Sequence, residues 1–118
     1  MSMKSNVDFS RIALLEAMRS QEGKTWDALA PLYGVANPDP PWKISLIAMC
    51  DCLADNGALP ALDRRRAEDE LAKVVYSDVP DPERQLLALA HTLLSRGLVT
   101  EGDLSSRMRA VRSRLEAA

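Results

Sequence analysis

Three consecutive arginines, Arg64, Arg65 and Arg66, are the side chains of this 118-residue sequence whose type and spacing could do chemistry. A guanidinium is a planar fork of donors that suits oxygen-rich or anionic groups. Acidic residues follow each arginine four positions later, at 68–70, so the pattern is also typical of a solvated helix face with three ion pairs. Because three cations near a helix start oppose the helix dipole, one of them could serve a group elsewhere. Both interpretations stay open.

Other reactive side chains are few. His91 is the only histidine, and without a serine or cysteine nucleophile pattern beside it we interpret it as a surface residue rather than a general base. Cys50 and Cys52 lie two positions apart, so on a helix their side chains diverge by roughly 160° and do not form a mutual disulfide. A structural zinc needs four ligands, and there is no second Cys or His pair, so we interpret Cys50 as a small core residue.

No catalytic constellation accompanies these residues. The chain is therefore either not an enzyme, or it contributes residues to a site that another chain mostly builds. Net charge is −2, from 15 basic and 17 acidic residues that are well mixed, which disfavours nucleic acid and anionic membranes as partners. The sequence has no long apolar run and no secretory leader pattern, so the expected location is cytoplasmic.

Apolar residues recur at spacings of three and four along the whole chain, which predicts an all-α fold: a small helical bundle of about five to six helices. Thr25, Asp81 and Thr100 are expected to cap helices, and the leucine-rich fifth helix is expected at the centre. The predicted helices cover residues 5–20, 25–33, 41–56, 63–76, 82–96 and 100–115. The proline-rich residues 34–41 are predicted to link an N-terminal helical arm, 1–33, to a helical domain, 42–118.

The ordered motifs of the second part of the chain resemble the helical N-terminal region of nitrile hydratase β subunits. Within that family the resemblance is greater to the separate β subunit of thiocyanate hydrolases. It covers roughly two thirds of the chain and is carried by Trp42 before an apolar helix, Cys50-Asp51-Cys52-Leu53, Gly57, Asp63-Arg64-Arg65-Arg66, Val75-Tyr76, Pro80 and Gly97-Leu98-Val99-Thr100.

The resemblance implies that this chain holds no cofactor itself and packs on an α-type subunit. That subunit would carry cobalt or iron in a claw of oxidised cysteines, and a separate β-barrel subunit could complete the assembly. Arg65 would hydrogen-bond the sulfur oxygens, as the catalytic contribution of this chain. Arg64, Ala61, Asp81 and Gln85 would lie beside the substrate, a nitrile or a thiocyanate-like anion.

The sequence departs from the family pattern at two places. The usual pair of tyrosines and a following aromatic residue are replaced by Asp81, Pro82 and Gln85, and the glycine-rich N-terminal arm is absent. Activator proteins that load the metal resemble the same region. The resemblance favours a subunit that is inactive on its own. Two alternatives stay open, a metallochaperone-like activator and a plain helical protein-interaction domain.

Overall fold

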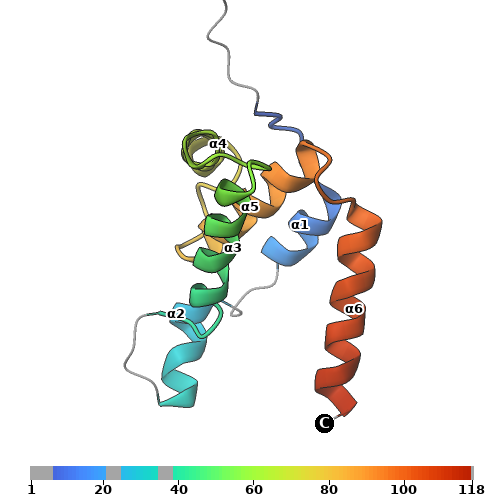
Figure 1. The fold of residues 1–118 in the computed structure, drawn as a ribbon. Helices are drawn as coiled ribbons and strands as arrows, with labels where there is room; N and C mark the ends of the chain where they lie inside the picture. Colours follow the sequence, from blue (N-terminus) through green and yellow to red (C-terminus); the bar gives the residue numbers. More distant parts are fainter. Residues whose placement is uncertain (1–6, 21–24, 35–38, 118) are drawn as a thin grey trace, which may run out of the picture.

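A computed structural model describes residues 7–20, 25–34 and 39–117. These residues contain six α-helices and no strand, which confirms the predicted all-α bundle (Figure 1). The elements are α1 (Ala13–Arg19), α2 (Trp26–Leu29), the 3-10 helix η1 (Ala30–Tyr33), α3 (Lys43–Asp55), α4 (Ala61–Val74), α5 (Glu83–Ser95) and α6 (Glu101–Ala117).

Helix α5 is the central element, as its leucine pattern predicts. It packs against α4 and α1 on one side, in a core that contains Leu15, Leu71 and Leu87. A second apolar cluster joins it to α3 and to the α3–α4 turn through Leu46, Cys50, Leu59 and Leu89. The prediction that Cys50 is a core residue is confirmed, because its side chain is buried there.

The first helix is shorter than predicted. Residues 7–12 are not helical, and α1 begins at Ala13. The backbone N–H of Ser10 donates to the Asp8 carboxylate at 2.8 Å, a local turn that competes with helix formation. The Asp8 carbonyl is held by His91 of α5 at 2.6 Å, which fixes this segment against the core. Residues 5 and 6 of the predicted helix lie outside the described residues, and so does Gly23, the glycine that predicts the end of this helix in the sequence.

The prediction that His91 is a surface residue is wrong: its side chain is fully buried. Its Nε2 lies 2.6 Å from the carbonyl oxygen of Asp8, and its Nδ1 lies 2.7 Å from the hydroxyl of Tyr76. Since a carbonyl oxygen only accepts, Nε2 carries the proton, and in the neutral imidazole Nδ1 accepts from the tyrosine hydroxyl. Both ring nitrogens thus have partners, which is what allows this side chain to be buried.

The structure agrees with the three predicted helix caps to different degrees. The N–H of Asp103 donates to the Thr100 hydroxyl at 3.0 Å, so the predicted cap of α6 is confirmed. Asp81 does not cap α5, because Pro82 occupies the position before the helix and Asp81 lies one residue further out. Thr25 is the N-cap residue of α2, as predicted, but its hydroxyl donates to the Asp27 carboxylate and makes no capping hydrogen bond.

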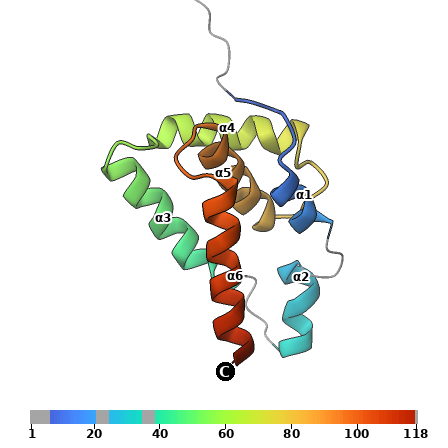
Figure 2. The same cartoon turned by 90° about the vertical axis from the view of Figure 1, so that its right-hand side faces the viewer.

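Helix α6 runs for 17 residues, and none of them is buried. In both views its C-terminal end extends away from α4 and α5 (Figures 1 and 2). In the part of the chain that is described, no helix has the length and apolarity needed to span a bilayer. The division into an arm, a linker and a domain stays a prediction, and residues 35–38 of the predicted linker lie outside the described residues.

Candidate functional site

A polar cavity of about 520 Å³ lies where the start of α3 faces α4 and the start of α5. Two of the predicted site residues, Asp81 and Gln85, are among the residues that line it. The full lining consists of Asp39, Lys43, Glu68, Asp69, Ala72, Asp81, Pro82, Arg84, Gln85 and Ala88. Of the other lining residues, Glu68 and Asp69 carried a signal in the sequence, their spacing of four from Arg64 and Arg65, and the rest were not predicted.

Arg64 pairs with Glu68, one turn further along α4. The two side chains are only 15% and 13% exposed, so the prediction of a solvated pair is wrong at this position. Burial raises the pKa of Glu68, and the nearby Arg64 and Gln85 oppose that rise. The Nε atom of Arg64 is buried and has no hydrogen-bond partner among the described residues. The charge of Arg64 is thus neutralised inside the chain rather than offered to a ligand.

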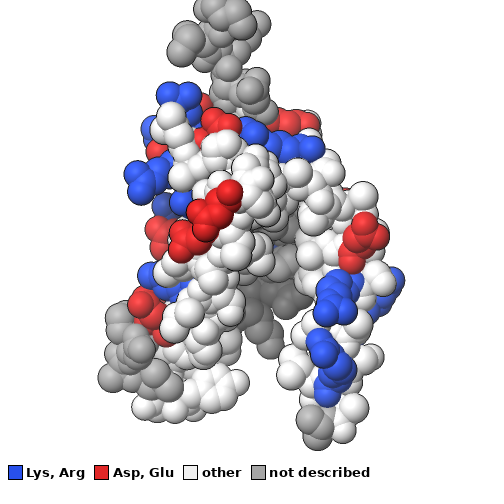
Figure 3. Space-filling view, viewed as in Figure 1, with Lys and Arg blue, Asp and Glu red and all other residues white. Residues whose placement is uncertain are grey.

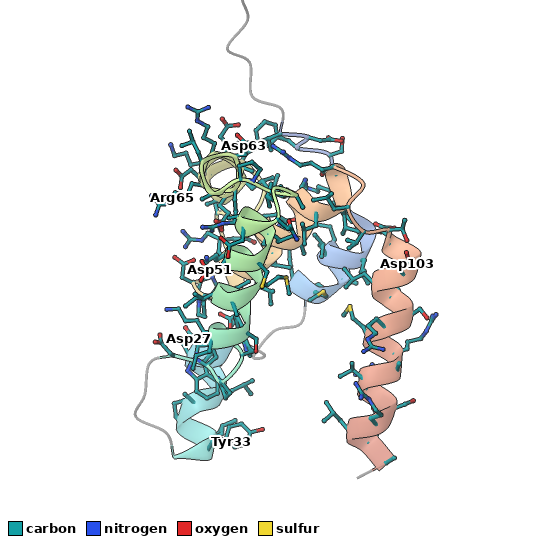
Figure 4. All side chains as sticks on the ribbon, viewed as in Figure 1. Asp27, Tyr33, Asp51, Asp63, Arg65 and Asp103 are labelled. Carbon is teal, nitrogen blue, oxygen red and sulfur yellow. The ribbon has the colours of Figure 1, made fainter. Side chains whose placement is uncertain are left out.

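Arg65 lies on an exposed side of α4 and extends outward from the helix (Figure 4). Within the described ranges neither Arg65 nor Arg66 makes an ion pair or side-chain hydrogen bond, so the other two predicted ion pairs, to Asp69 and Glu70, are not formed. Because residues four apart share a helix face, Ala61, Arg65 and Asp69 form one exposed stripe. Asp69 also lines the polar cavity, so the stripe and the cavity adjoin.

The structure therefore divides the predicted site residues into two neighbouring sets. Ala61 and Arg65 lie on the exposed stripe, whereas Asp81 and Gln85 line the cavity. Arg64 belongs to neither surface, because Glu68 holds it behind the cavity wall.

The two sets of residues lie in surroundings of opposite charge. The cavity lining has four carboxylates against Lys43 and Arg84. Lys43 pairs with Asp39 at 3.1 Å, and the Arg84 Nε donates to the Val79 carbonyl at 2.7 Å. Basic and acidic side chains are interleaved on the surface over α3 and α4 (Figure 3). An anion is therefore favoured at the exposed Arg65 and Arg66 rather than inside the cavity.

The described residues do not fit a cobalt or iron centre. They contain no group of three or more His, Cys, Asp and Glu side chains that could hold a metal ion. Cys50 is buried and Cys52 is exposed, so the two thiols lie on different sides of α3. Burial also raises the pKa of the Cys50 thiol, and a protonated thiol is a poor metal ligand.

Comparison with known proteins finds a similarity to one enzyme subunit. The chain is 32% identical, over 75 residues, to the β subunit of thiocyanate hydrolase from Thiobacillus thioparus. The matched part makes up 63% of this chain and 48% of that protein, so the chain spans about half the length of this relative. No family model and no solved structure matches the chain.

Proposed function

We propose that this chain is a small β-type subunit of a thiocyanate hydrolase-like or nitrile hydratase-like enzyme and that it packs on an α-type subunit that carries the metal. The observation that carries the proposal is the 32% identity to a protein named as thiocyanate hydrolase subunit β. The absence of a metal-binding group among the described residues is compatible with a site whose metal belongs to another chain.

Arg65 is the residue through which this chain would complete the site. Its guanidinium is exposed and has no ion-pair partner in the described structure, so its donors are available to another molecule. A planar fork fits two neighbouring sulfur oxygens of oxidised cysteines on the partner better than an ammonium does. The buried Arg64–Glu68 pair would position the start of α4 and thereby the direction of Arg65.

Ala61, Asp81 and Gln85 would border the route of the substrate. Ala61 lies one turn before Arg65, where its small side chain leaves space beside the guanidinium. Gln85 offers a neutral amide donor in a cavity that is otherwise mostly charged. Asp81 would repel an anion from the cavity and leave it to Arg65. The cobalt or iron of the partner would supply activation of water or of the substrate.

Co-expression with an α-type chain that contains a Cys-x-x-Cys-Ser-Cys segment tests this function. We expect a stoichiometric complex on size exclusion that persists after the α-type chain is metallated and that hydrolyses thiocyanate or hydrates a nitrile. The isolated chain should retain no cobalt or iron and show no turnover.

An active α-type species from which this chain has been released would favour the activator alternative instead. Failure to bind any such α-type chain would leave only the helical interaction domain. A separate β-barrel chain in the active complex would identify a further subunit of the assembly.

A further inference from the structure

The apolar stripe of α6 is exposed instead of packed against the bundle. Met108 and Val111 are both 37% exposed and Leu115 is 73% exposed, although the helix runs for 17 residues. Most of the stability of a helix in a protein comes from packing of its apolar face rather than from helix propensity. The face of α6 therefore lacks the cover that such a helix ordinarily has.

The spacing of the stripe fits another helix. Leu104, Met108, Val111 and Leu115 follow one another at steps of four, three and four, which is the seam of a heptad repeat. Beside this seam a second cavity, of about 510 Å³, separates α6 from the rest of the bundle. Met18, Trp42 and Leu86 line it opposite Met108, and the space-filling view shows the hollow (Figure 3).

Arginines flank the seam on both margins. By helical spacing Arg107 and Arg114 lie along one margin, and Arg109 and Arg112 along the other. One ion pair involves them, between Arg112 and Glu116 at 3.3 Å, and both of its side chains are more than 70% exposed. In the described part of the chain the other three arginines have no acidic partner. The seam thus has a cationic rim on an exposed helix.

A second copy of this chain is a poor occupant. If two α6 seams paired antiparallel, with Leu104 opposite Leu115, Arg107 of one copy would approach Arg114 of the other. A parallel pairing would bring Arg107 near Arg112 of the other copy. Like charges at these flanking positions oppose association in either orientation.

We propose that α6 is the docking surface for an amphipathic helix of another protein, whose apolar seam is flanked by Asp and Glu. The apolar residues of that helix would cover the stripe and the mouth of the cavity, and its acids would meet the arginine rim. The proposal does not depend on the proposed enzymatic role, because it involves neither Arg65 nor the polar cavity.

Two synthetic helical peptides of about three heptads test it. Both carry the same leucine and isoleucine seam, one with Glu and the other with Lys at the flanking positions, and each is titrated with the full chain by fluorescence anisotropy. We expect the Glu peptide to bind at least about tenfold more tightly at low salt, with the difference shrinking as salt screens the charges.

Matched variants locate the binding. Val111→Glu should weaken binding of the Glu peptide at least about tenfold. Ala110→Glu adds the same charge on the exposed opposite face and should leave the affinity unchanged. The combined Arg107→Glu, Arg112→Glu and Arg114→Glu variant should prefer the Lys peptide. Circular dichroism of each variant verifies that the helices are retained, as expected for substitutions at exposed positions.

Three results would overturn the proposal. They are equal affinity for the two peptides, no binding of the Glu peptide at millimolar concentration, and a dimer of the chain in sedimentation that Val111→Glu dissociates, which would assign the seam to a second copy.

Discussion

Arginines are used in opposite ways at the junction of α1, α4 and α5 and along α6. Arg19 of α1 has a side chain only 16% exposed; it donates to the Val75 carbonyl at 2.6 Å, pairs with Asp78 and Glu16, and lies 5.7 Å from the Tyr76 ring centre. On α6 the Arg112 side chain is 78% exposed. Arg19 therefore stabilises the fold through its contacts with the backbone and with acidic side chains. The exposed arginines of α6 remain available to other molecules.

The largest effect on stability is expected for leucines, which show the same contrast between buried and exposed positions. Leu71 is fully buried in the α4–α5 core, whereas Leu115 of α6 is 73% exposed. We expect Leu71→Ala to lower the free energy of unfolding by about 2–5 kcal/mol, because it leaves a cavity in the core. Leu115→Ala should change it by less than about 0.5 kcal/mol. Urea unfolding of the two variants measures both values, and equal losses would show that α6 packs on the bundle in solution.

A second prediction concerns pH and the buried Tyr76–His91 pair. Burial raises the pKa of Tyr76 from 10.0 to about 12, with a smaller contribution from the charge of Glu16. Between those values the unfolded phenol has lost its proton while the folded one keeps it, so the unfolded state binds fewer protons and stability falls as pH rises. The full contribution is present below about pH 10, and about 2–3 kcal/mol should be lost by about pH 12.

Tyr76→Phe is the control for this prediction. At neutral pH it removes the hydroxyl that donates to Nδ1 of His91 and should cost about 1–3 kcal/mol. Its stability should then fall less steeply than that of the wild type above pH 10. Parallel curves for the two proteins, from unfolding experiments at several pH values, would contradict a buried phenol.

A smaller difference in stability is expected between a variant of the partly buried Arg19 and a variant of the exposed Arg114. Arg19→Gln leaves the Val75 carbonyl without its donor and should lower the free energy of unfolding by about 1–2 kcal/mol. Arg114→Gln, on the exposed face of α6, should alter it by less than about 0.5 kcal/mol. Thermal unfolding of the two variants measures this difference, and a loss in Arg114→Gln as large as that in Arg19→Gln would remove the distinction.

Local patterns in the sequence predicted what local forces decide. The leucine spacing of α5 and the Thr100–Asp103 cap of α6 need only near neighbours, and both are present in the structure. The burial of His91 depends on the backbone of Asp8, 83 residues away in the sequence, so no helical pattern around the histidine could reveal it.

The candidate site shows the same limit. The spacing of four between Arg64 and Glu68 predicted their ion pair, but its burial depends on α5 packing against α4. The cavity that Asp81 and Gln85 share with Asp39 and Lys43 joins three separate segments, and only the folded chain brings them together.

Arg65 is proposed to contact a partner chain rather than its own chain, and a pair of matched variants distinguishes the two cases. Arg65→Lys keeps the charge but loses the planar fork, and Arg66→Lys makes the same change at the neighbouring exposed position. Both should leave the stability of the isolated chain within about 0.5 kcal/mol. In the complex with the metallated α-type subunit, Arg65→Lys should weaken affinity by about 2–5 kcal/mol and abolish most turnover, while Arg66→Lys should resemble the wild type. Wild-type affinity and activity for Arg65→Lys would show that Arg65 makes no such contact with the partner.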